Sequence, residues 1–257
     1  MLNYSEHGTD TDAPPLVIVH GLYGSGRNWG VIAKRLSDRS RVITPDMRNH
    51  GDSPTEPTNS YPEMAADLAE LIEHIGGPVD LCGHSMGGKA AMVLALTRPD
   101  LLRRLIVADI APVPYAHSQS HHIAAMRSVD LATVTRRSEA SEQLGHHGVE
   151  PALQSFFTQS LDVANKRWKL NLDALEADMD AIIGFPEVTG VFEGPAFFLS
   201  GGESDYVRPE HRPRIKELFP RARFAKLPGA GHWLHAEKPR EFEAALRAFL
   251  DAEASPG

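Results

Sequence analysis

A serine between two glycines is the clearest chemical signal in this sequence of 257 residues. Ser85 is the centre of the pentapeptide Gly-His-Ser-Met-Gly at 83–87, which follows the apolar run 79–82 and precedes the Ala- and Leu-rich segment 88–96. A buried strand that turns through Gly-x-Ser-x-Gly into a helix forms a nucleophile elbow, in which the serine hydroxyl is exposed and aimed. The two glycines leave room for the sharp turn. The pattern predicts that Ser85 is a nucleophile; a strand-to-helix turn with closely packed glycines is the alternative interpretation.

A serine nucleophile needs a base close to its hydroxyl. His232 is the candidate base, because it follows the β-rich run 223–227 through a Gly-rich loop. This position places its ring at the same edge of a parallel sheet as Ser85. His235, three residues further on, is the local competitor, but it lies beyond the loop. His84 is adjacent to Ser85 and is expected to point away from it, with a hydrogen bond in the wall of the strand.

The base in turn needs an acid that orients it, and the residues alone leave this acid open. Asp109 ends one β-rich run, and Asp205 lies just beyond the next one. Both respect the chain order serine, acid, histidine, and both would reach the edge of the sheet where Ser85 is expected. Asp173 is a third and more remote candidate. For each, the alternative is a carboxylate that caps the following turn.

Two backbone amides are expected to form an oxyanion hole. Leu22 lies in the loop after the first strongly apolar run, and Met86 directly follows the nucleophile. Amides at these two places are the natural donors to the oxygen that becomes negative during acyl transfer.

The elements that must position these residues follow from the alternation of apolar runs with helical patterns. This alternation predicts an α/β fold with a doubly wound, mostly parallel sheet and crossover helices. One crossover helix is predicted after Ser60, because Glu63 lies three residues later as in a capping box. The last helix is predicted over 242–250, where apolar residues recur at helical spacing. The predicted strands are 16–20, 42–45, 79–83, 105–109, 196–200 and 223–227.

One interval, residues 112–194, contains no convincing strand and only helical patterns. A long helical insertion at the end of the sheet where sites form is typical of a cap over a pocket. The chain is therefore expected to be a single domain, 1–257, with a helical cap at 112–194 inserted between two core strands. The aromatic and leucine residues of the cap suggest an apolar pocket for an acyl chain or a ring, although each one alone could simply pack the cap onto the sheet.

The composition excludes several classes of partner. The formal net charge is −8, so no basic surface is available for nucleic acid or anionic lipid. No apolar run is long enough to span a bilayer, and residues 1–11 lack the pattern of a signal peptide, which predicts a cytoplasmic location without membrane contact. The single cysteine, Cys82, excludes an internal disulfide and is expected to be an inert core residue. The oligomeric state stays open.

Thirteen histidines raise the question of a metal site, above all the adjacent pairs 121–122 and 146–147. Adjacent histidines on a helix point in different directions. We therefore expect no metal and no cofactor, and we expect these four histidines to be solvated residues of the cap.

Five motifs, in order over nearly the whole chain, together resemble the α/β-hydrolases, and among them the YbfF-type bacterial esterases and their mitochondrial relatives. The resemblance implies the α/β-hydrolase fold, with serine and histidine roles for Ser85 and His232. It favours Asp109 as the acid, although many other members of the superfamily place the acid where Asp205 stands. The motifs are His20-Gly21-Leu22-Tyr23-Gly24-Ser25, Asp46-Met47-Arg48-Asn49-His50-Gly51-Asp52-Ser53, Gly83-His84-Ser85-Met86-Gly87-Gly88-Lys89, Asp109-Ile110-Ala111-Pro112 and Gly229-Ala230-Gly231-His232-Trp233.

The sequence thus predicts a cofactor-free serine carboxylesterase that hydrolyses small-molecule esters or thioesters through an acyl-enzyme. Carbon-carbon bond hydrolysis or cofactor-free perhydrolysis on the same fold is the alternative within enzymes. A small-molecule receptor with this fold, whose cap closes on a ligand without turnover, is the alternative from another class.

Overall fold

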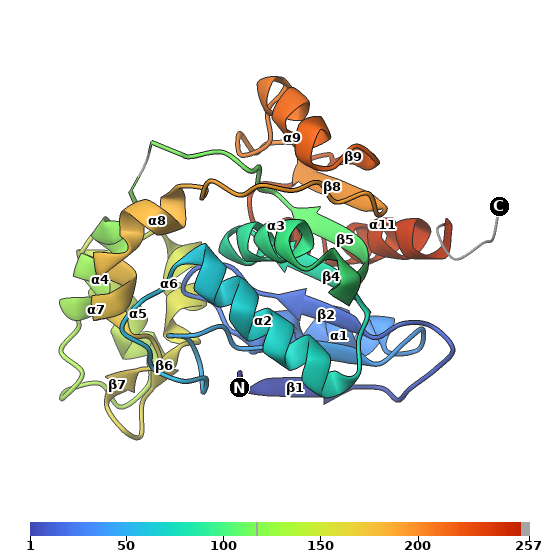
Figure 1. Ribbon diagram of the computed structural model, residues 1–257. Coiled ribbons are helices and arrows are strands. Elements are labelled where there is room, and N and C mark those ends of the chain that lie inside the picture. The colour runs from blue at the N-terminus through green and yellow to red at the C-terminus, as the bar shows by residue number, and fades with distance from the viewer. Residues whose placement is uncertain (117, 253–257) are drawn as a thin grey trace.

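A seven-stranded sheet runs through the centre of the molecule in the computed structural model, which describes residues 1–116 and 118–252 (Figure 1). The strand order is β1-β3-β2-β4-β5-β8-β9. All neighbouring strands are parallel except β1, which pairs antiparallel with β3. The strands are β1 (Tyr4–His7), β2 (Leu16–Val19), β3 (Val42–Pro45), β4 (Val79–His84), β5 (Leu102–Ala108), β8 (Ala196–Gly201) and β9 (Ala222–Leu227).

The predicted doubly wound, mostly parallel sheet is therefore confirmed. Each predicted strand is present, with its ends shifted by at most three residues. Strand β1 was not predicted, because its residues, Tyr-Ser-Glu-His, are polar and half-exposed at the edge of the sheet. From β2 the chain goes first to β3 on one side and then to β4 on the other. Ligands of such sheets bind at this switch point, beyond the carboxyl ends of the strands.

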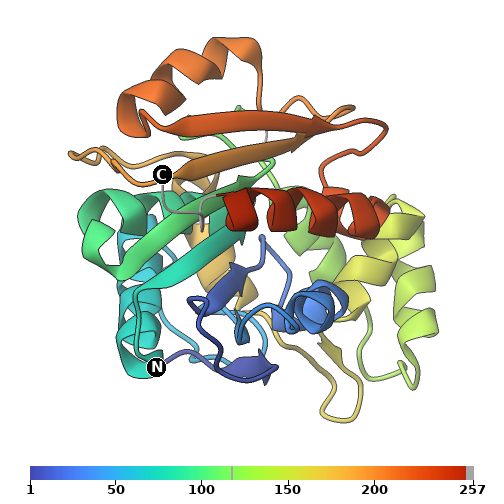
Figure 2. The same ribbon diagram turned by 90° about the vertical axis from the view of Figure 1, so that its right-hand side faces the viewer.

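Helices cover both faces of the sheet, so the core has two halves. In β2, Val17 and Val19 pack into one half with helices α2 (Tyr61–Ile75), α3 (Met86–Thr97) and α9 (Arg212–Leu218). Leu16 and Ile18 alternate with them and pack into the other half. That half is completed by α1 (Gly30–Leu36), α10 (Leu234–Glu237) and α11 (Pro239–Ala252). Figure 2 shows α11 in front of the strands, with β1 at the bottom and β9 near the top. Burial on both faces explains why these strands are continuous apolar runs.

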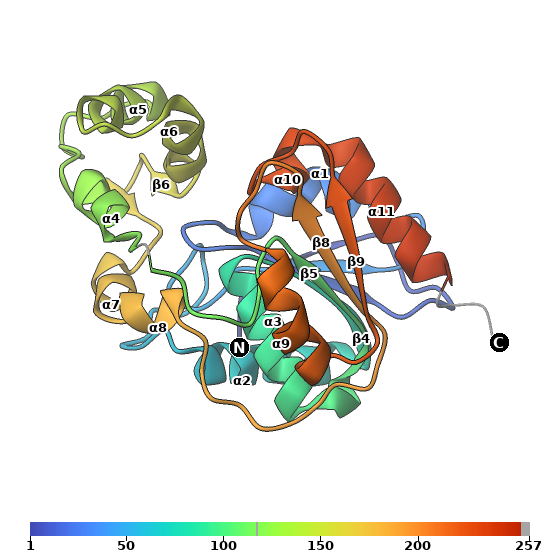
Figure 3. The ribbon, with the colours of Figure 1, turned by 90° about the horizontal axis from the view of Figure 1, so that it is seen from above.

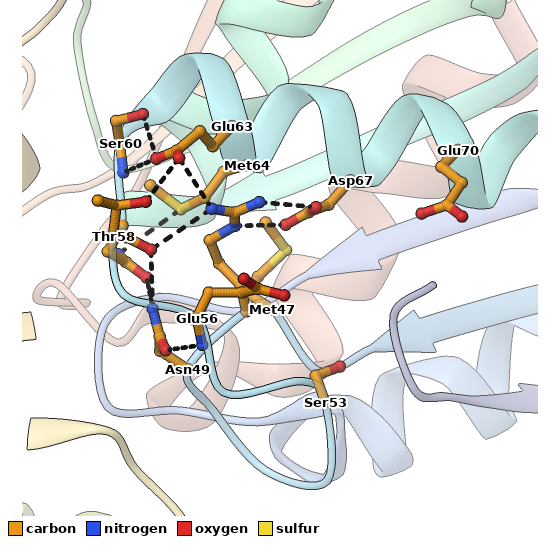
Figure 4. Close-up of polar contacts among 12 residues, drawn as sticks. Met47, Asn49, Ser53, Glu56, Thr58, Ser60, Glu63, Met64, Asp67 and Glu70 are labelled. Atoms are coloured by element: carbon orange, nitrogen blue, oxygen red, sulfur yellow. Dashed lines mark hydrogen bonds and ion pairs between the residues drawn. The ribbon is translucent and has the colours of Figure 1, made fainter. Parts of the chain in front are cut away.

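The start of α2 is fixed by the predicted capping box. Oε2 of Glu63 accepts a hydrogen bond from the amide of Ser60 at 3.1 Å. The same helix holds the long loop that precedes it, because the guanidinium of Arg48 binds both oxygens of Asp67, at 2.6 and 2.9 Å. Figure 4 shows this group of contacts, with Glu63 and Asp67 on the helix and Thr58 and Asn49 on the loop. Asn49 therefore has a fixed position from which it can bind the segment described next.

The chain between β5 and β8 is mostly helical and forms a group of its own beside the sheet (Figure 3). A short hairpin, β6 (Leu161–Asp162) and β7 (Arg167–Trp168), corrects the prediction of no strand here; two residues per strand are too few to leave an alternating pattern. Asn171 docks this segment on the core, because its side-chain amide donates to Oδ1 of Asn49 at 3.0 Å. The helices are α4 (Ser120–Arg127), α5 (Arg137–His146), α6 (Pro151–Thr158), α7 (Leu172–Ala177) and α8 (Met179–Ile183).

Candidate active site

Ser85 occupies a strained corner between β4 and α3. Its backbone angles are φ 52° and ψ −120°, a conformation that side chains rarely adopt. The glycines on either side are required by close contacts. A methyl group at Gly83 would lie 2.3 Å from the carbonyl oxygen of Gly87, and one at Gly87 would lie 2.4 Å from that of His20. The corner lifts the Ser85 side chain out of the sheet at the carboxyl end of β4.

Three side chains that are far apart in the sequence meet at this corner. The hydroxyl of Ser85 lies 3.1 Å from Nε2 of His232, and Nδ1 of His232 lies 2.8 Å from Oδ2 of Asp109. Because the carboxylate accepts a hydrogen bond from the protonated Nδ1, Nε2 of the neutral ring has a lone pair that faces the serine hydroxyl. Asp109 is fully buried, whereas His232 retains 15 % side-chain exposure. The structure thus brings together the serine, the histidine and the first of the candidate acids.

The carboxylate of Asp109 has further partners that the sequence did not indicate. Its Oδ1 accepts a hydrogen bond from the amide of Gly201 at 2.9 Å. Its Oδ2 accepts one from the hydroxyl of Ser204 at 2.5 Å and another from the imidazole of His232. These three donors offset the cost of burying a charge. Ser204 follows β8 in a loop without any recognisable pattern, so no local signal marks it.

The other candidates lie elsewhere. The side chain of Asp205 is exposed. Asp173 lies on the surface of the helical segment between β5 and β8, where its 91 % exposed side chain forms an ion pair of 2.5 Å with Arg127. His235 is buried and stacks on Trp29, with ring centroids 4.1 Å apart. His84, as expected, hydrogen-bonds in the wall of the site: its Nε2 donates to the carbonyl oxygen of His232 at 2.8 Å.

The two residues expected to supply the oxyanion amides, Leu22 and Met86, line the same cavity as Ser85. Met86 is the first residue of α3, so its amide is among those that have no acceptor within the helix. The loop that carries Leu22 packs directly on the elbow, because a methyl group at Gly21 would lie 3.1 Å from Cβ of Ser85. Close approach of backbone to the nucleophile is what an oxyanion hole requires.

Two buried histidines hold this loop in place. Nε2 of His20 accepts the amide of Met47 at 2.9 Å, and Nε2 of His50 accepts the amide of Tyr23 at 3.1 Å. Their Nδ1 atoms donate to backbone carbonyls, at 2.8 Å in each case. Both rings therefore serve as neutral linkers. Burial lowers the pKa of His20 and lowers the pKa of His50 to about 3.

The buried histidines predict a loss of stability in mild acid. Burial lowers the pKa of His235 to about 3, whereas the pKa of the same side chain in the unfolded protein lies near the ordinary histidine value of 6.5. Between these two pH values the unfolded chain binds the additional proton, so stability is complete above about pH 6.5 and is lost as the pH falls toward 3. Each such histidine contributes a slope of about 1.4 kcal/mol per pH unit to the free energy of unfolding.

This slope can be measured by urea unfolding between pH 4 and 7. The matched variant is His235→Phe, which keeps a ring against Trp29 and removes one titrating group. Carboxylates titrate in the same range, but they contribute equally to both proteins. We expect the free energy of unfolding to fall less steeply in the variant, by about 1.4 kcal/mol per pH unit. Equal slopes in the two proteins would contradict the assignment of a buried neutral histidine.

A cavity of about 530 Å³ opens above Ser85 and His232. Its apolar wall includes residues of the helical segment between β5 and β8 and of the loops after β5 and β9, among them Ile110, Leu153, Phe156, Phe157, Ile182 and Trp233. Other apolar residues of the segment, such as Leu161 and Leu175, are buried in the core instead. Some apolar residues of this segment therefore line the cavity and others pack the segment onto the core, so both interpretations of the sequence apply.

One of the expected solvated histidines is not solvated. His122 is half-buried in the cavity wall between Tyr23 and Phe157, with ring centroids 6.3 and 5.0 Å away, and burial lowers its pKa to about 4. His146 and His147 are exposed, as expected. Over residues 1–116 and 118–252, no group of three or more His, Cys, Asp or Glu side chains could hold a metal ion. Among the same residues, no helix is long and apolar enough to cross a membrane.

Lys89 is a cavity residue whose role the sequence did not indicate. It lies one helical turn after Ser85 and is almost fully buried. Its Nζ donates to the carbonyl oxygens of Ile183, at 2.8 Å, and Gly184, and lies 4.7 Å from the centre of the Tyr115 ring. Burial lowers the pKa of Lys89 to about 7. The side chain ties the end of α8 to the core beside the cavity.

The serine lies on a strand–turn–helix corner at the switch point of a parallel sheet, and it is paired with a histidine and an aspartate that follow later strands. This arrangement defines the class of α/β hydrolases. The comparisons agree. The chain belongs to the alpha/beta hydrolase family, whose model matches residues 16–245.

Named relatives extend over nearly the whole chain. The sn-1-specific diacylglycerol lipase ABHD11 of Mus musculus is 42 % identical over 97 % of this chain and 85 % of its own length. Esterase YbfF of Escherichia coli is 37 % identical over 92 % of this chain and 93 % of its own length. Among solved structures, a marine microorganism esterase superposes with a TM-score of 0.89 at 39 % identity, covering 96 % of this chain and 98 % of that one. The predicted resemblance to this group is confirmed.

Proposed function

We propose that this protein is a serine carboxylesterase in which Ser85 is the nucleophile, His232 the general base and Asp109 the acid that orients it. The observation that carries the proposal is the continuous line of contacts from Ser85 to Asp109 through the imidazole, at 3.1 and 2.8 Å, at the floor of an apolar cavity. Carboxylic ester hydrolysis fits the family and the names of its relatives.

The first half of the reaction acylates the enzyme. Oγ of Ser85 attacks the carbonyl carbon of the ester or thioester while its proton passes to Nε2 of His232. The carbonyl oxygen becomes negative and accepts hydrogen bonds from the amides of Leu22 and Met86. Nε2 then returns the proton to the leaving alkoxide or thiolate as the bond to it breaks. The product is an acyl ester on Ser85.

The second half hydrolyses this acyl-enzyme. A water molecule gives a proton to Nε2 of His232 and attacks the acyl carbon, and the same two amides stabilise the second oxyanion. The bond to Oγ breaks, and Ser85 regains its proton from the imidazolium. The carboxylic acid leaves, and the residues return to their starting state without a cofactor.

The size and the apolar wall of the cavity favour an acyl chain as the substrate group that it binds. A cavity of about 530 Å³ lies within the usual size of small-molecule sites, and its wall of Phe156, Phe157 and Trp233 favours apolar groups. We further propose that residues 112–194 act as the cap of a single domain spanning residues 1–257, because α4 to α8 lie between β5 and β8, and residues of α4, α6 and α8 line this cavity. A cytoplasmic location stays a prediction from the sequence.

Activity-based labelling joined to a panel of acyl lengths tests the function. We expect a fluorophosphonate to add covalently to Ser85, located by mass spectrometry of peptides, and nitrophenyl esters from acetyl to palmitoyl to be hydrolysed with a preference set by the cavity. The panel includes the matching coenzyme A thioesters, diketones for carbon-carbon hydrolysis and peroxide-dependent halogenation. Absence of labelling and of ester or thioester turnover at every chain length would overturn the proposal. Ligand-dependent thermal stabilisation under the same conditions would then favour the receptor alternative.

A further inference from the structure

The ring of Tyr206 lies flat against the ring of His232. Their centroids are 4.0 Å apart, and the two planes differ by only 21°. Two further rings near this imidazole are tilted or edge-on: His84 lies 4.7 Å away at 41°, and Trp233 lies 5.4 Å away at 74°. Tyr206 is half-buried and lines the cavity, and it comes from the loop after β8.

The position of this ring is fixed from two sides. The amide of Tyr206 donates to Oγ of Ser204 at 3.3 Å, and that hydroxyl in turn donates to Oδ2 of Asp109. On the other side, the hydroxyl of Tyr115 donates to the carbonyl oxygen of Tyr206 at 2.7 Å. The carboxylate that orients the imidazole is therefore linked, through one serine, to the residue that stacks on the imidazole.

We propose that Tyr206 is a positioning residue whose ring face stabilises the imidazolium form of His232. The inference rests on the proposed function, in which His232 gains a proton only as Ser85 attacks. The face of an aromatic ring is negative and attracts a cation, more strongly where water is excluded. A contact that strengthens when the charge appears lowers the barrier, because it stabilises the transition state more than the ground state.

In the described part of the chain, the other groups that face His232 either contact its two nitrogens or stay neutral. Asp109, at the end of β5, holds Nδ1, and Ser85, after β4, faces Nε2. From β4 and α10, His84 and His235 face the imidazole, and both are buried with pKa values well below the ordinary range, so they stay neutral and supply no charge. At the end of α10, the carboxylate of Glu237 accepts a hydrogen bond from the amide of Gly231, in the adjacent loop, at 2.7 Å.

Two substitutions distinguish the electrostatic effect of the ring face from simple apolar packing. Tyr206→Phe keeps the ring, and Tyr206→Leu keeps an apolar side chain without a ring. For Leu we expect kcat to fall by about 5- to 30-fold with little change in KM, as loss of a partly desolvated cation–π contact implies. The acidic limb of kcat/KM should move to lower pH by about 0.7 to 1.5 units, since one unit corresponds to a tenfold change. For Phe, both quantities should stay close to the parent, within about threefold.

A readout that needs no turnover keeps the test independent of the proposed function. Titration of the His232 ring by nuclear magnetic resonance in the ligand-free protein should show a lower midpoint in the Leu variant than in the parent and the Phe variant. Equal midpoints in all three proteins, or a loss in Phe as large as in Leu, would overturn the inference. A shifted midpoint in a protein that hydrolyses no ester would leave the ring contact intact and overturn only the proposed function.

Discussion

Substitution of Ser85 by alanine is expected to lower kcat about 10⁶-fold, because it removes the one atom that forms the acyl bond. Substrate binding should change little, since the cavity wall and the oxyanion amides remain. Alanine has the same Cβ as serine and meets the same strain at φ 52°, so the fold should keep its stability. The measurement is single-turnover and steady-state hydrolysis of the best ester from the acyl panel, with melting temperature as the check on folding.

The matched control is Ser138→Ala, which removes a hydroxyl from an exposed position on α5. Its activity and its labelling by the fluorophosphonate should equal those of the parent. The Ser85 variant should show no covalent label and should still be stabilised by substrate. A Ser85→Ala protein that is folded and keeps a tenth of the parent rate would remove Ser85 from the chemistry.

The sheet could be predicted because its central strands are buried on both faces. In β2 every residue, Leu16 to Val19, is buried, so the strand is a continuous apolar run that stands out from the polar loops. In the edge strand β1, Ser5 and Glu6 are exposed and no residue is fully buried, so the strand has no such run. Hairpin β6–β7 is too short for any period to develop. A strand can thus be predicted from this sequence when it is buried on both faces and long enough to form an apolar run.

The elbow and the base could be predicted because each has a local pattern. Gly83 and Gly87 flank Ser85 in a five-residue pattern that the sharp turn requires, and His232 follows a glycine-rich turn. Ser204 and Tyr206 have no such pattern, because their roles arise only when the loop after β8 packs against the end of β5. His122 has no such pattern either, since it becomes half-buried only when the helices between β5 and β8 are folded around it.

The acid could not be fixed from the residues alone, and the structure explains why. Asp109 and Asp205 both follow a strand, so both satisfy the same chain order. What separates them is the backbone: Asp109 has φ 52° and lies fully buried against His232, whereas the side chain of Asp205 is exposed. A positive φ at an aspartate is not visible in a pattern of residue types.

Substitution of Asp109 by asparagine is expected to lower kcat/KM by up to about 10⁴-fold. The amide of Gly201 donates to Oδ1, so the oxygen of the new amide group must stay at that position. Its nitrogen then faces Nδ1 of His232, where the parent has an acceptor. Two donors cannot share one hydrogen bond, so the imidazole must place its proton on Nε2 and lose the lone pair that Ser85 needs.

The paired substitution Asp205→Asn decides between the two candidate acids. Because this side chain is exposed, we expect kcat/KM to stay within about twofold of the parent. Hydrolysis is measured for both variants with one ester, and labelling of Ser85 is followed in time. The Asp109 variant should label slowly, because the nucleophile is intact but its base holds the wrong tautomer. A large loss in Asp205→Asn with a mild one in Asp109→Asn would reassign the acid, and equal partial losses would mean that the two carboxylates share the role.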